Sequence, residues 1–358
     1  MEKKIAVLPG DGIGEEVVSQ ALRVLEQTQK KFNHRFICSH ALVGGAAFDR
    51  FGNHFPDETR QICENSDAIL FGSVGGPVSE QHLPKWKACE ANSILTLRKA
   101  FSFNANFRPA KVFPLLKDIS PIKEEVISGG VDLLIIRELL GDVYFGKHAT
   151  FIENNQRVAT DEARYSEDQI ASIARVAFNA AMKRRKKLTS IDKANVLDTS
   201  KLWRAVVLEV SEEFPDVELE NMLVDSCAMQ LVKKPSYFDV VLCPNLFGDI
   251  LSDLAAVLPG SLGLLASASM NAAGFGMYEP PGGSAPRMAG KNTVNPIGQI
   301  LSAAMMLRFS FGLNNEAKAI EDAVEKTLID GFRTKDLYRG SGKLVGTKEI
   351  TDEIIERL

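Results

Sequence analysis

The chain has 358 residues, a length that can bury a large core and suggests two domains. Hydrophobic residues make up 45% and charged residues 25%, with a formal net charge of -4, so the composition gives no reason to expect nucleic acid or an anionic membrane as a partner. We see no signal or transit segment and no apolar run long enough to span a bilayer. Five scattered cysteines without a CxxC pair favour a reduced, cytoplasmic protein.

The chain opens with an expected strand, a glycine-rich turn and a helix. The strand covers residues 4–8 and the helix residues 15–30, where apolar side chains recur on one face. The turn resembles a dinucleotide-binding fingerprint, but Gly10, Gly12 and Gly14 spell GxGxG, and no acidic residue ends a second strand at the required distance. The pattern therefore predicts a close backbone approach near a ligand rather than a Rossmann fingerprint.

Strands and helices then alternate along the chain, which predicts an α/β fold with a largely parallel sheet between helices. Residues 144–164 break this rhythm with two short β-like runs around Glu153-Asn154-Asn155, so we expect an arm or hairpin that pairs across a dimer. The further expected strands cover residues 35–42, 67–71, 104–112, 131–138, 190–197, 218–225 and 238–242, and the further helices residues 93–103, 166–187, 245–260, 295–313, 316–330 and 348–358.

The expected helix over residues 245–260 carries two carboxylates. Asn245 is its expected N-cap, and Asp249 and Asp253, four residues apart, share one face. Like charges at this spacing repel unless a cation lies between them, although a solvated acidic face remains an alternative. Because the helix follows a buried strand, the carboxylates lie where ligands bind in α/β sheets. With Asp225, and without His or Cys nearby, they favour Mg²⁺ or Mn²⁺.

Three arginines occur at the ends of expected elements. Arg98 shares a helix face with Ile94, Arg108 precedes a proline, and Arg137 ends an otherwise apolar strand. Each alone is more often part of a structural ion pair. Together they suggest an anion with several carboxylates, because guanidinium groups bind carboxylates with two parallel hydrogen bonds.

Other candidates are weaker when each is taken alone. Tyr144 can be a packed aromatic residue, and Lys193 an exposed lysine or a base whose pKa is lowered by partial burial. The segment from Glu279 to Pro286, followed by Arg287 and Asn295, is either a flexible loop or a backbone that passes close to a ribose or phosphate.

Several long motifs occur in one order over nearly the whole chain: LPGDGIG, LRKAFSFNANFRPAKV, RELLGDVYFG, DKANVLDTS, VDSCAMQL, NLFGDILSDLAA, and EPPGGSAP with AGK and NP after it. Together they resemble the isocitrate/isopropylmalate family of β-decarboxylating dehydrogenases, most closely its isopropylmalate branch. The resemblance implies a two-domain, non-Rossmann α/β fold with a dimerisation arm. Residues 1–104 and 259–358 would form a discontinuous cofactor-binding domain, and residues 105–258 the substrate, metal and dimerisation domain.

The implied reaction is the metal-dependent oxidative decarboxylation of (2R,3S)-3-isopropylmalate to 4-methyl-2-oxopentanoate with reduction of NAD, in leucine biosynthesis. Hydride passes from C2 to the nicotinamide before CO₂ is lost, and Mg²⁺ or Mn²⁺ polarises the C2 oxygen. The partners implied are the substrate and a second copy of the chain in a homodimer.

The resemblance also assigns roles to single residues. Tyr144 matches the acid that protonates the enolate, and Lys193 the base, which crosses the dimer interface together with Asp225. The metal ligands are Asp225, Asp249 and Asp253, and Arg98, Arg108 and Arg137 bind the substrate carboxylates. The pocket for the isopropyl group is formed by Glu90, Ile94 and Leu95, whose aliphatic pair would leave the third carboxylate of isocitrate unpaired. The cofactor residues are Gly75, Gly263, Glu279, Gly282, Gly283, Ser284, Ala285, Arg287 and Asn295.

Some positions depart from the family pattern. Gly282 replaces a common His, and Leu140 and Asp142 replace the more usual Thr and Gly. Arg287 stands where NAD-dependent members usually have an Asp that binds the adenosine ribose, and an arginine could instead attract the 2′-phosphate of NADP. NAD remains the expected cofactor. The alternatives are a sister enzyme for isocitrate, homoisocitrate or tartrate, with NADP as its possible cofactor, and a non-catalytic regulatory subunit.

Overall fold

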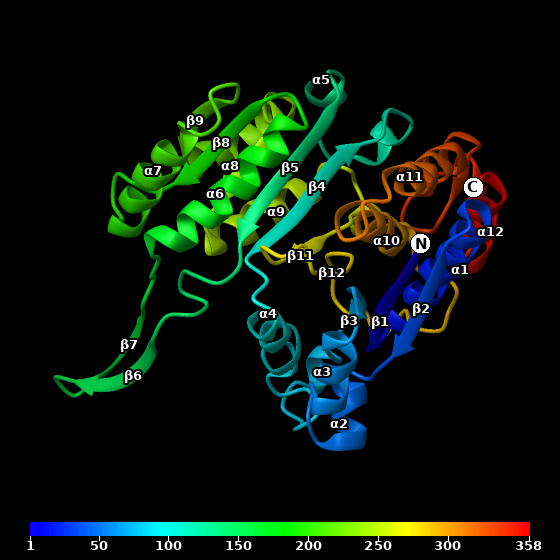
Figure 1. The fold of residues 1–358 in the computed structure, drawn as a ribbon, viewed down its shortest axis with the longest axis horizontal. Helices are drawn as coiled ribbons and strands as arrows, with labels where there is room; N and C mark the ends of the chain where they lie inside the picture. Colours follow the sequence, from blue (N-terminus) through cyan, green and yellow to red (C-terminus); the bar gives the residue numbers. More distant parts are fainter. The chain divides into compact units, whose positions relative to one another are not determined.

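The computed structural model describes all 358 residues, and the chain divides into two compact units. Unit 1 consists of residues 1–101 and 259–358, and unit 2 of residues 102–258. Unit 1 is therefore built from both ends of the chain and unit 2 from its middle (Figure 1). None of the helices combines the length and the apolarity needed to cross a bilayer.

The sheet of unit 1 has the strand order β2-β1-β3-β12-β11, in which only the pair β11 and β12 is antiparallel. Its strands are β1 (Glu2–Gly10), β2 (Arg35–His40), β3 (Ala68–Ser73), β11 (Ala268–Met270) and β12 (Gly276–Tyr278). The helices are α1 (Gly14–Phe32), α2 (Gly45–Phe51), α3 (Asp57–Glu64), α4 (Thr96–Ala100), α10 (Ile297–Phe309), α11 (Asn314–Ile329) and α12 (Thr347–Arg357). A small ladder joins β13 (Phe332–Arg333) to β14 (Lys343–Leu344).

The glycine-rich turn after β1 packs against other backbone segments of unit 1. Gly10 and Gly12 have left-handed backbones, with φ of 75° and 59°. A Cβ would lie 1.9 Å from the carbonyl oxygen of Ser73 at Gly10, and 2.0 Å from that of Ser284 at Gly12. Glycine is needed because any side chain would collide there. Between them, the buried carboxylate of Asp11 accepts hydrogen bonds from the backbone N–H groups of Gly45, Ala46 and Gly75.

The sheet of unit 2 has the order β4-β5-β10-β8-β9, with β4 antiparallel to β5 and the other pairs parallel. In β5, VDLLIIRE, every residue but Asp132 is buried, which is typical of a central strand covered on both faces. The strands are β4 (Ala105–Val112), β5 (Val131–Glu138), β8 (Lys187–Asp192), β9 (Glu218–Leu223) and β10 (Val240–Cys243). The helices are α5 (Glu124–Ile127), α6 (Glu167–Met182), α7 (Asp198–Ser211), α8 (Val224–Lys233) and α9 (Asn245–Ala256).

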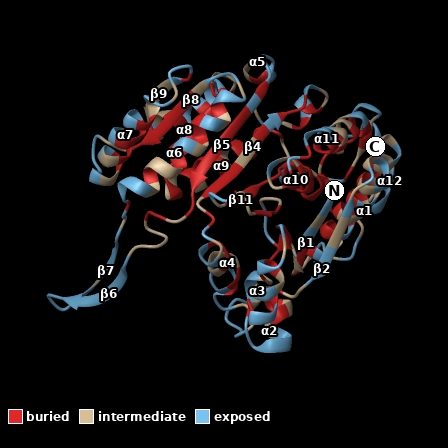
Figure 2. Cartoon of the chain, viewed as in Figure 1, coloured by how far each residue is buried: buried red, intermediate tan, exposed pale blue.

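A two-stranded ribbon projects from unit 2. It pairs β6 (His148–Glu153) with β7 (Gln156–Asp161), and nearly all of its residues are exposed (Figures 1 and 2). Phe151 and Ile152 are 42% and 68% exposed. The expected hairpin is confirmed. An isolated pair of strands is only marginally stable in water. The pairing of this ribbon across a dimer stays a prediction.

Two site residues that were expected within strands lie outside them. The strand expected over residues 190–197 is β8, which stops at Asp192, so Lys193 follows the strand instead of interrupting it. The Asp192 carboxylate accepts the N–H of Ala194, and the Lys193 N–H donates to Ser200; these local bonds compete with the strand ladder. Asp225 likewise lies in the first turn of α8, not at the end of a strand.

The expected capping and some short elements also differ. The N-cap of α9 is Pro244, and Asn245 is already helical, so its side chain makes long-range bonds instead. The helix expected over residues 93–103 is a π-helical turn, Ala91–Leu95, followed by α4. Helices α2, α3, α5, α7 and α8 and strands β11 to β14 were not expected, and these strands have only two or three residues each.

Candidate active site and cofactor cavity

A cluster of charged side chains lies where β5 ends and α9 begins. Arg137, at the end of β5, has a side chain only 4% exposed. Its Nε donates to Oδ1 of Asn245 at 3.0 Å, and its Nη1 forms an ion pair with Asp249. The buried charge of Arg137 is therefore paired with the carboxylate of Asp249, one helical turn into α9.

Tyr144 joins this cluster from the loop after β5. Its hydroxyl donates to Oδ2 of Asp249 at 2.6 Å, and the Arg137 guanidinium carbon lies 5.3 Å from the ring centroid. Burial raises the pKa of Tyr144, and the hydrogen bond to the Asp249 carboxylate raises it further, against the opposing effect of Arg137. The phenol therefore stays protonated at neutral pH, as a proton donor must be.

The second carboxylate of α9 faces another arginine. Asp253 is 75% exposed, and its Oδ1 lies 3.8 Å from Nη1 of Arg108, on β4. The Nε of Arg108 donates to Oδ1 of Asn106 at 2.8 Å. Each carboxylate of the pair thus has a guanidinium beside it, which offsets the repulsion expected at their spacing.

The donor set of α9 fits a hard divalent cation in its chemistry. Asp249 and Asp253 offer carboxylate oxygens from one helix face, the ligands that Mg²⁺ and Mn²⁺ prefer. No group of three His, Cys, Asp or Glu side chains converges in the chain, so Asp225 does not join them within one copy. A complete site needs oxygens from water, substrate or a second chain.

Lys193 and Asp225 pair with each other in another part of unit 2. The Nζ of Lys193 lies 2.6 Å from Oδ1 of Asp225, with side chains 28% and 58% exposed. The hydrogen bond from Lys193 lowers the pKa of Asp225. The expected base and the expected third ligand are therefore neighbours on one exposed surface.

The expected substrate residues of unit 1 lie on and around the π-helical turn. Glu90 is exposed, and Ile94 and Leu95 are half-buried. Arg98 is buried and pairs at 3.5 Å with Glu279, which the sequence had assigned to the cofactor. A Cβ on Gly75 would lie 3.7 Å from Oε1 of Glu90, so this glycine runs beside the same turn.

Unit 1 also contains a cavity of about 850 Å³, within the usual size range of ligand pockets. Six of the nine expected cofactor residues line it: Gly263, Gly282, Gly283, Ala285, Arg287 and Asn295. Gly75, Glu279 and Ser284 are not in its wall; Ser284 is buried behind the glycine-rich turn. The expected segment therefore frames a real cavity rather than a loop without a pocket.

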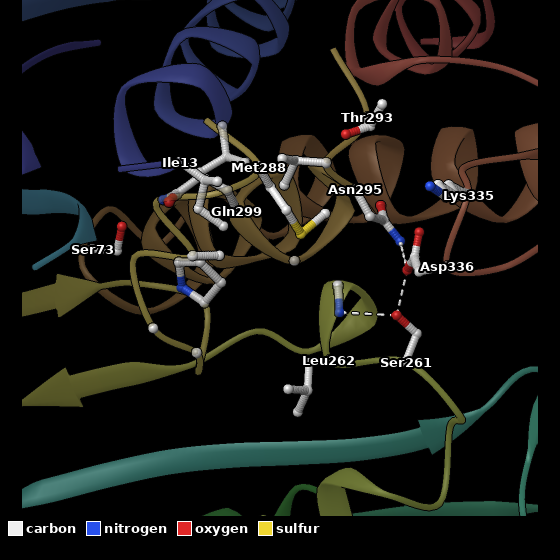
Figure 3. Close-up of a pocket in the computed structure, with 18 of the residues that line it drawn as sticks. Ile13, Ser73, Ser261, Leu262, Met288, Thr293, Asn295, Gln299, Lys335 and Asp336 are labelled. Carbon is white, nitrogen blue, oxygen red and sulfur yellow. Dashed lines mark hydrogen bonds between the residues drawn. The ribbon is translucent and has the colours of Figure 1, made fainter. Parts of the chain in front are cut away.

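Polar residues that sequence reasoning missed complete the wall of this cavity. Asp336 accepts hydrogen bonds from Nδ2 of Asn295, at 3.0 Å, and from the Ser261 hydroxyl (Figure 3). Gln299, on α10, is 1% exposed, and neither its amide oxygen nor its amide nitrogen has a hydrogen-bond partner. Such an orphaned amide in a cavity wall suits a ligand with polar groups. Its one signal in the sequence is a glutamine in the first turn of a largely apolar helix.

The rim of the cavity is cationic. Arg287, Lys291 and Lys335 border it, whereas the carboxylate of Asp336 is already engaged by its neighbours. Three cations beside a single carboxylate that is hydrogen-bonded to its neighbours favour an anionic ligand.

Comparison with known proteins matches this architecture to one family. A family model described as isocitrate/isopropylmalate dehydrogenase matches residues 4–354. A 3-isopropylmalate dehydrogenase of Syntrophotalea carbinolica is 54% identical over 360 residues, covering 100% of this chain and 98% of its own. A 3-isopropylmalate dehydrogenase of Geobacter metallireducens is 55% identical over 358 residues, covering 99% of each chain.

A solved structure has the same fold over the full length of the chain. The crystal structure of isocitrate dehydrogenase from Methylococcus capsulatus has a TM-score of 0.85 and 34% identity, covering 99% of each chain. The match of the family model and of these relatives extends over both units, including β5, α9 and the cavity of unit 1. The chain belongs to the isocitrate/isopropylmalate dehydrogenase family, whose members are oxidoreductases.

Proposed function

We propose that the chain catalyses the oxidative decarboxylation of (2R,3S)-3-isopropylmalate to 4-methyl-2-oxopentanoate with reduction of NAD, a step of leucine biosynthesis. The observation that carries this proposal is identity above one half, over the full length, to chains named 3-isopropylmalate dehydrogenase. The charged cluster at Arg137, Tyr144 and Asp249 supports it, because the reaction needs an anion binder, an acid and a metal ligand.

Each group of this chain has one task in the proposed reaction. Arg98, Arg108 and Arg137 bind carboxylates, and Lys193 takes the proton of the C2 hydroxyl as hydride leaves C2 for the nicotinamide. CO₂ then departs from the carboxylate on C3, and Tyr144 gives its proton to the resulting enolate at C3. Mg²⁺ or Mn²⁺, held by Asp249 and Asp253 with Asp225 of a second copy, would supply Lewis-acid polarisation of the C2 oxygen.

The preference for isopropylmalate over isocitrate rests on the turn of residues 91–95. Ile94 and Leu95 offer partly exposed aliphatic surface beside the exposed Glu90. A third carboxylate there would lose its hydration without gaining a partner, and sites reject such mismatches strongly.

NAD is the proposed cofactor, with its adenosine half in the cavity of unit 1. The pocket size and the unpartnered amide of Gln299 support a polar, nucleotide-sized ligand. Arg287, Lys291 and Lys335 on the rim make NADP the specific alternative, since a 2′-phosphate would meet these cations.

We propose a homodimer formed through unit 2, because the proposed reaction draws Lys193 and Asp225 from a second copy. Exposed apolar side chains on α8 and α9 support it: Met229 is 55% and Ile250 58% exposed. The exposed ribbon of β6 and β7 supplies further unpaired surface. A dissociated chain should then be inactive. A cytoplasmic location stays a prediction from the cysteine pattern.

The deciding experiment follows nicotinamide reduction by the purified chain with Mn²⁺ and isopropylmalate, and compares kcat/KM for NAD⁺ and NADP⁺. We expect turnover with a preference for NAD⁺. A preference for NADP⁺ would show that the cationic rim governs cofactor choice. Turnover with isocitrate above that with isopropylmalate would refute the substrate assignment, and inactivity with every member of the substrate series would refute the enzyme assignment.

A further inference from the structure

Helix α9 begins without a capping side chain of its own. Its N-cap is Pro244, which has no hydroxyl or carboxylate to accept a hydrogen bond. The first two N–H groups donate instead to distant side chains: Asn245 N–H to the Tyr165 hydroxyl at 2.8 Å, and Leu246 N–H to Oδ2 of Asp142 at 3.1 Å. The start of the helix is therefore fixed by residues from two other segments.

The side chain of Asn245 joins this helix to the active-site cluster. It is 1% exposed, and both of its polar atoms are used. Oδ1 accepts from Nε of Arg137 at 3.0 Å, and Nδ2 donates to the carbonyl oxygen of Gly141 at 3.1 Å. One amide thus sets the direction of the arginine and holds the loop that carries Tyr144.

Glu138 completes the arrangement from the end of β5. It is 1% exposed, and its two carboxylate oxygens accept the N–H groups of Leu140 and Gly141 at 2.6 and 2.8 Å. Burial raises the pKa of the Glu138 carboxyl, while the N–H groups of Leu140 and Gly141 oppose the rise. Burial raises the pKa of Tyr165, and the charge of the nearby Glu138 carboxylate raises it further. The ring of Tyr165 packs directly on Gly141, where a Cβ would lie 2.2 Å from it.

We propose that Glu138, Tyr165 and Asn245, here named the support network, are positioning residues that hold Arg137, Tyr144 and Asp249 in one geometry. This rests on the proposed function, in which those three groups bind substrate, donate the proton and hold the metal. The network touches each of their carriers: the end of β5, the loop at residues 139–146 and the first turn of α9. No member of it reaches the reacting atoms in the proposed reaction.

The buried polar groups of the support network depend on one another for their hydrogen bonds. Removing the Tyr165 hydroxyl leaves the buried N–H of Asn245 without its acceptor, and the first turn of α9 would shift to find another. Since a small misplacement of catalytic groups lowers the rate strongly, the loss should fall on kcat more than on KM.

The test uses the full-length Tyr165→Phe variant with Tyr237→Phe as matched control. Both variants delete one hydrogen-bonded tyrosine hydroxyl of unit 2, and the Tyr237 hydroxyl donates to Glu220 at 2.7 Å outside the network. We expect kcat to fall roughly 10- to 100-fold in Tyr165→Phe, the range for outer-shell partners of metal sites. KM should change little, and the control should stay near wild type. Similar kinetics in the two variants would overturn the proposal.

A second variant separates positioning from lost stability. Asn245→Ala removes the amide that orients Arg137, and it should lower kcat by a similar factor. Because both changes act on one geometry, the double variant with Tyr165→Phe should lose little more than the worse single variant. The proposal would be contradicted if the fold-loss of kcat in the double variant equalled the product of the two single losses. A wild-type kcat in a folded Asn245→Ala chain would contradict it as well.

Hydrogen exchange gives a reading that does not depend on turnover. The amides of residues 245–249 should exchange faster in Tyr165→Phe than in wild type. Their exchange rates in Tyr237→Phe should equal those of wild type. Inactivity of the wild type would count against the proposed function alone, and the exchange result would still decide on the support network. Equal protection in all three chains would refute it.

Discussion

The hydroxyl of Tyr144 and the carboxylate of Asp249 share a hydrogen bond of 2.6 Å, so the proposed acid and the proposed metal ligand are in direct contact. Arg137 pairs with the other oxygen of the same carboxylate. A cation bound at Asp249 would compete with both neighbours for the oxygens. Arginine and tyrosine thus bond both oxygens of this carboxylate, and a metal ion held by Asp249 would have to share or replace these bonds.

Tyr144→Phe tests the acid. The change keeps the ring beside Arg137 and removes only the transferable proton, so kcat should fall by about 10²- to 10⁴-fold, the usual range for general acid catalysis, with KM for isopropylmalate little changed. Steady-state kinetics with Tyr237→Phe as control gives the answer. An unchanged kcat would remove this tyrosine from the mechanism.

Removal of the metal should abolish turnover. Chelation by EDTA is expected to stop nicotinamide reduction, and added Mn²⁺ to restore it. Asp249→Asn replaces a charged ligand by a neutral one, so it should weaken Mn²⁺ binding, measured by calorimetry, by about 10-fold or more. Asp198→Asn, at an exposed carboxylate of α7, should not alter it. Full activity in EDTA would contradict the metal role.

Gly12→Ala and Gly52→Ala form a matched pair. Both positions have left-handed φ, 59° and 67°, but a Cβ would lie 2.0 Å from the Ser284 carbonyl oxygen at Gly12 and meet nothing within 4 Å at Gly52. Gly52→Ala should cost about 1 to 2 kcal/mol of stability from backbone strain alone. Gly12→Ala should cost more and also raise KM for NAD⁺, because it displaces the loop beside the cavity. Equal effects of the two changes on KM would argue against this loop as a cofactor contact.

The pair of His34 and Glu316 gives a prediction for acid stability. The two side chains lie 2.7 Å apart, each 12% exposed. Burial raises the pKa of Glu316, but the hydrogen bond from His34 and that from its own N–H outweigh this, and the pKa is lowered. A lowered carboxyl pKa stabilises the fold above the ordinary value of 4.5, and that contribution is lost as the pH falls through the lowered pKa.

The measurement compares the free energy of unfolding of wild type and Glu316→Gln between pH 6 and pH 3. We expect a deficit of about 1 to 2 kcal/mol in the variant at pH 6, which shrinks as the pH falls. Glu64→Gln, at an exposed position on α3, is the control. A difference in the free energy of unfolding that does not depend on pH would show that ionisation of Glu316 does not contribute to stability.

Thiol chemistry should single out one cysteine. Cys38 is exposed, and the other four are buried. Burial raises the pKa of Cys63 and Cys227 to about 12 and that of Cys89 to about 11, and holds Cys243 well above its usual value. Because the thiolate is the reactive form, Ellman's reagent at pH 8 should modify a single thiol in the native chain, absent in Cys38→Ser, and five after denaturation. Rapid modification of several thiols would mean that the core opens readily.

The part of the site that the sequence predicts is the part that follows local patterns. The apolar run before Arg137 marks a buried strand, and the helical spacing after Asn245 puts Asp249 on one face. Since β5 and β10 are parallel neighbours, their carboxyl ends meet at one edge, and α9 starts there. The sequence places Arg137 at the end of one strand and Asp249 in the helix after another, and the structure adds that the two strands are neighbours and the two side chains pair.

The rest depends on pairings that local patterns do not encode. The Tyr165 hydroxyl accepts a hydrogen bond from the N–H of Asn245, 80 positions away, and Asp142 accepts one from Leu246, 104 positions away. Asn245 has the residue type of an N-cap but does not act as one. In the cavity, Asp336 approaches Asn295 from a turn with no motif. Strands β11 and β12 have three residues each, too few for a period to be seen.

The division of unit 1 between the two ends of the chain sets the order in which the protein can be made. Strand β3, buried at all of its six residues, pairs with β12, which is synthesised only after the whole of unit 2. At about 5 to 20 residues per second, ribosomes need roughly 8 to 30 s to pass residues 102–258. During that time unit 2 can fold, while the first hundred residues wait with an apolar edge uncovered. A fragment that stops after unit 2 would keep this edge of β3 without its partner strand.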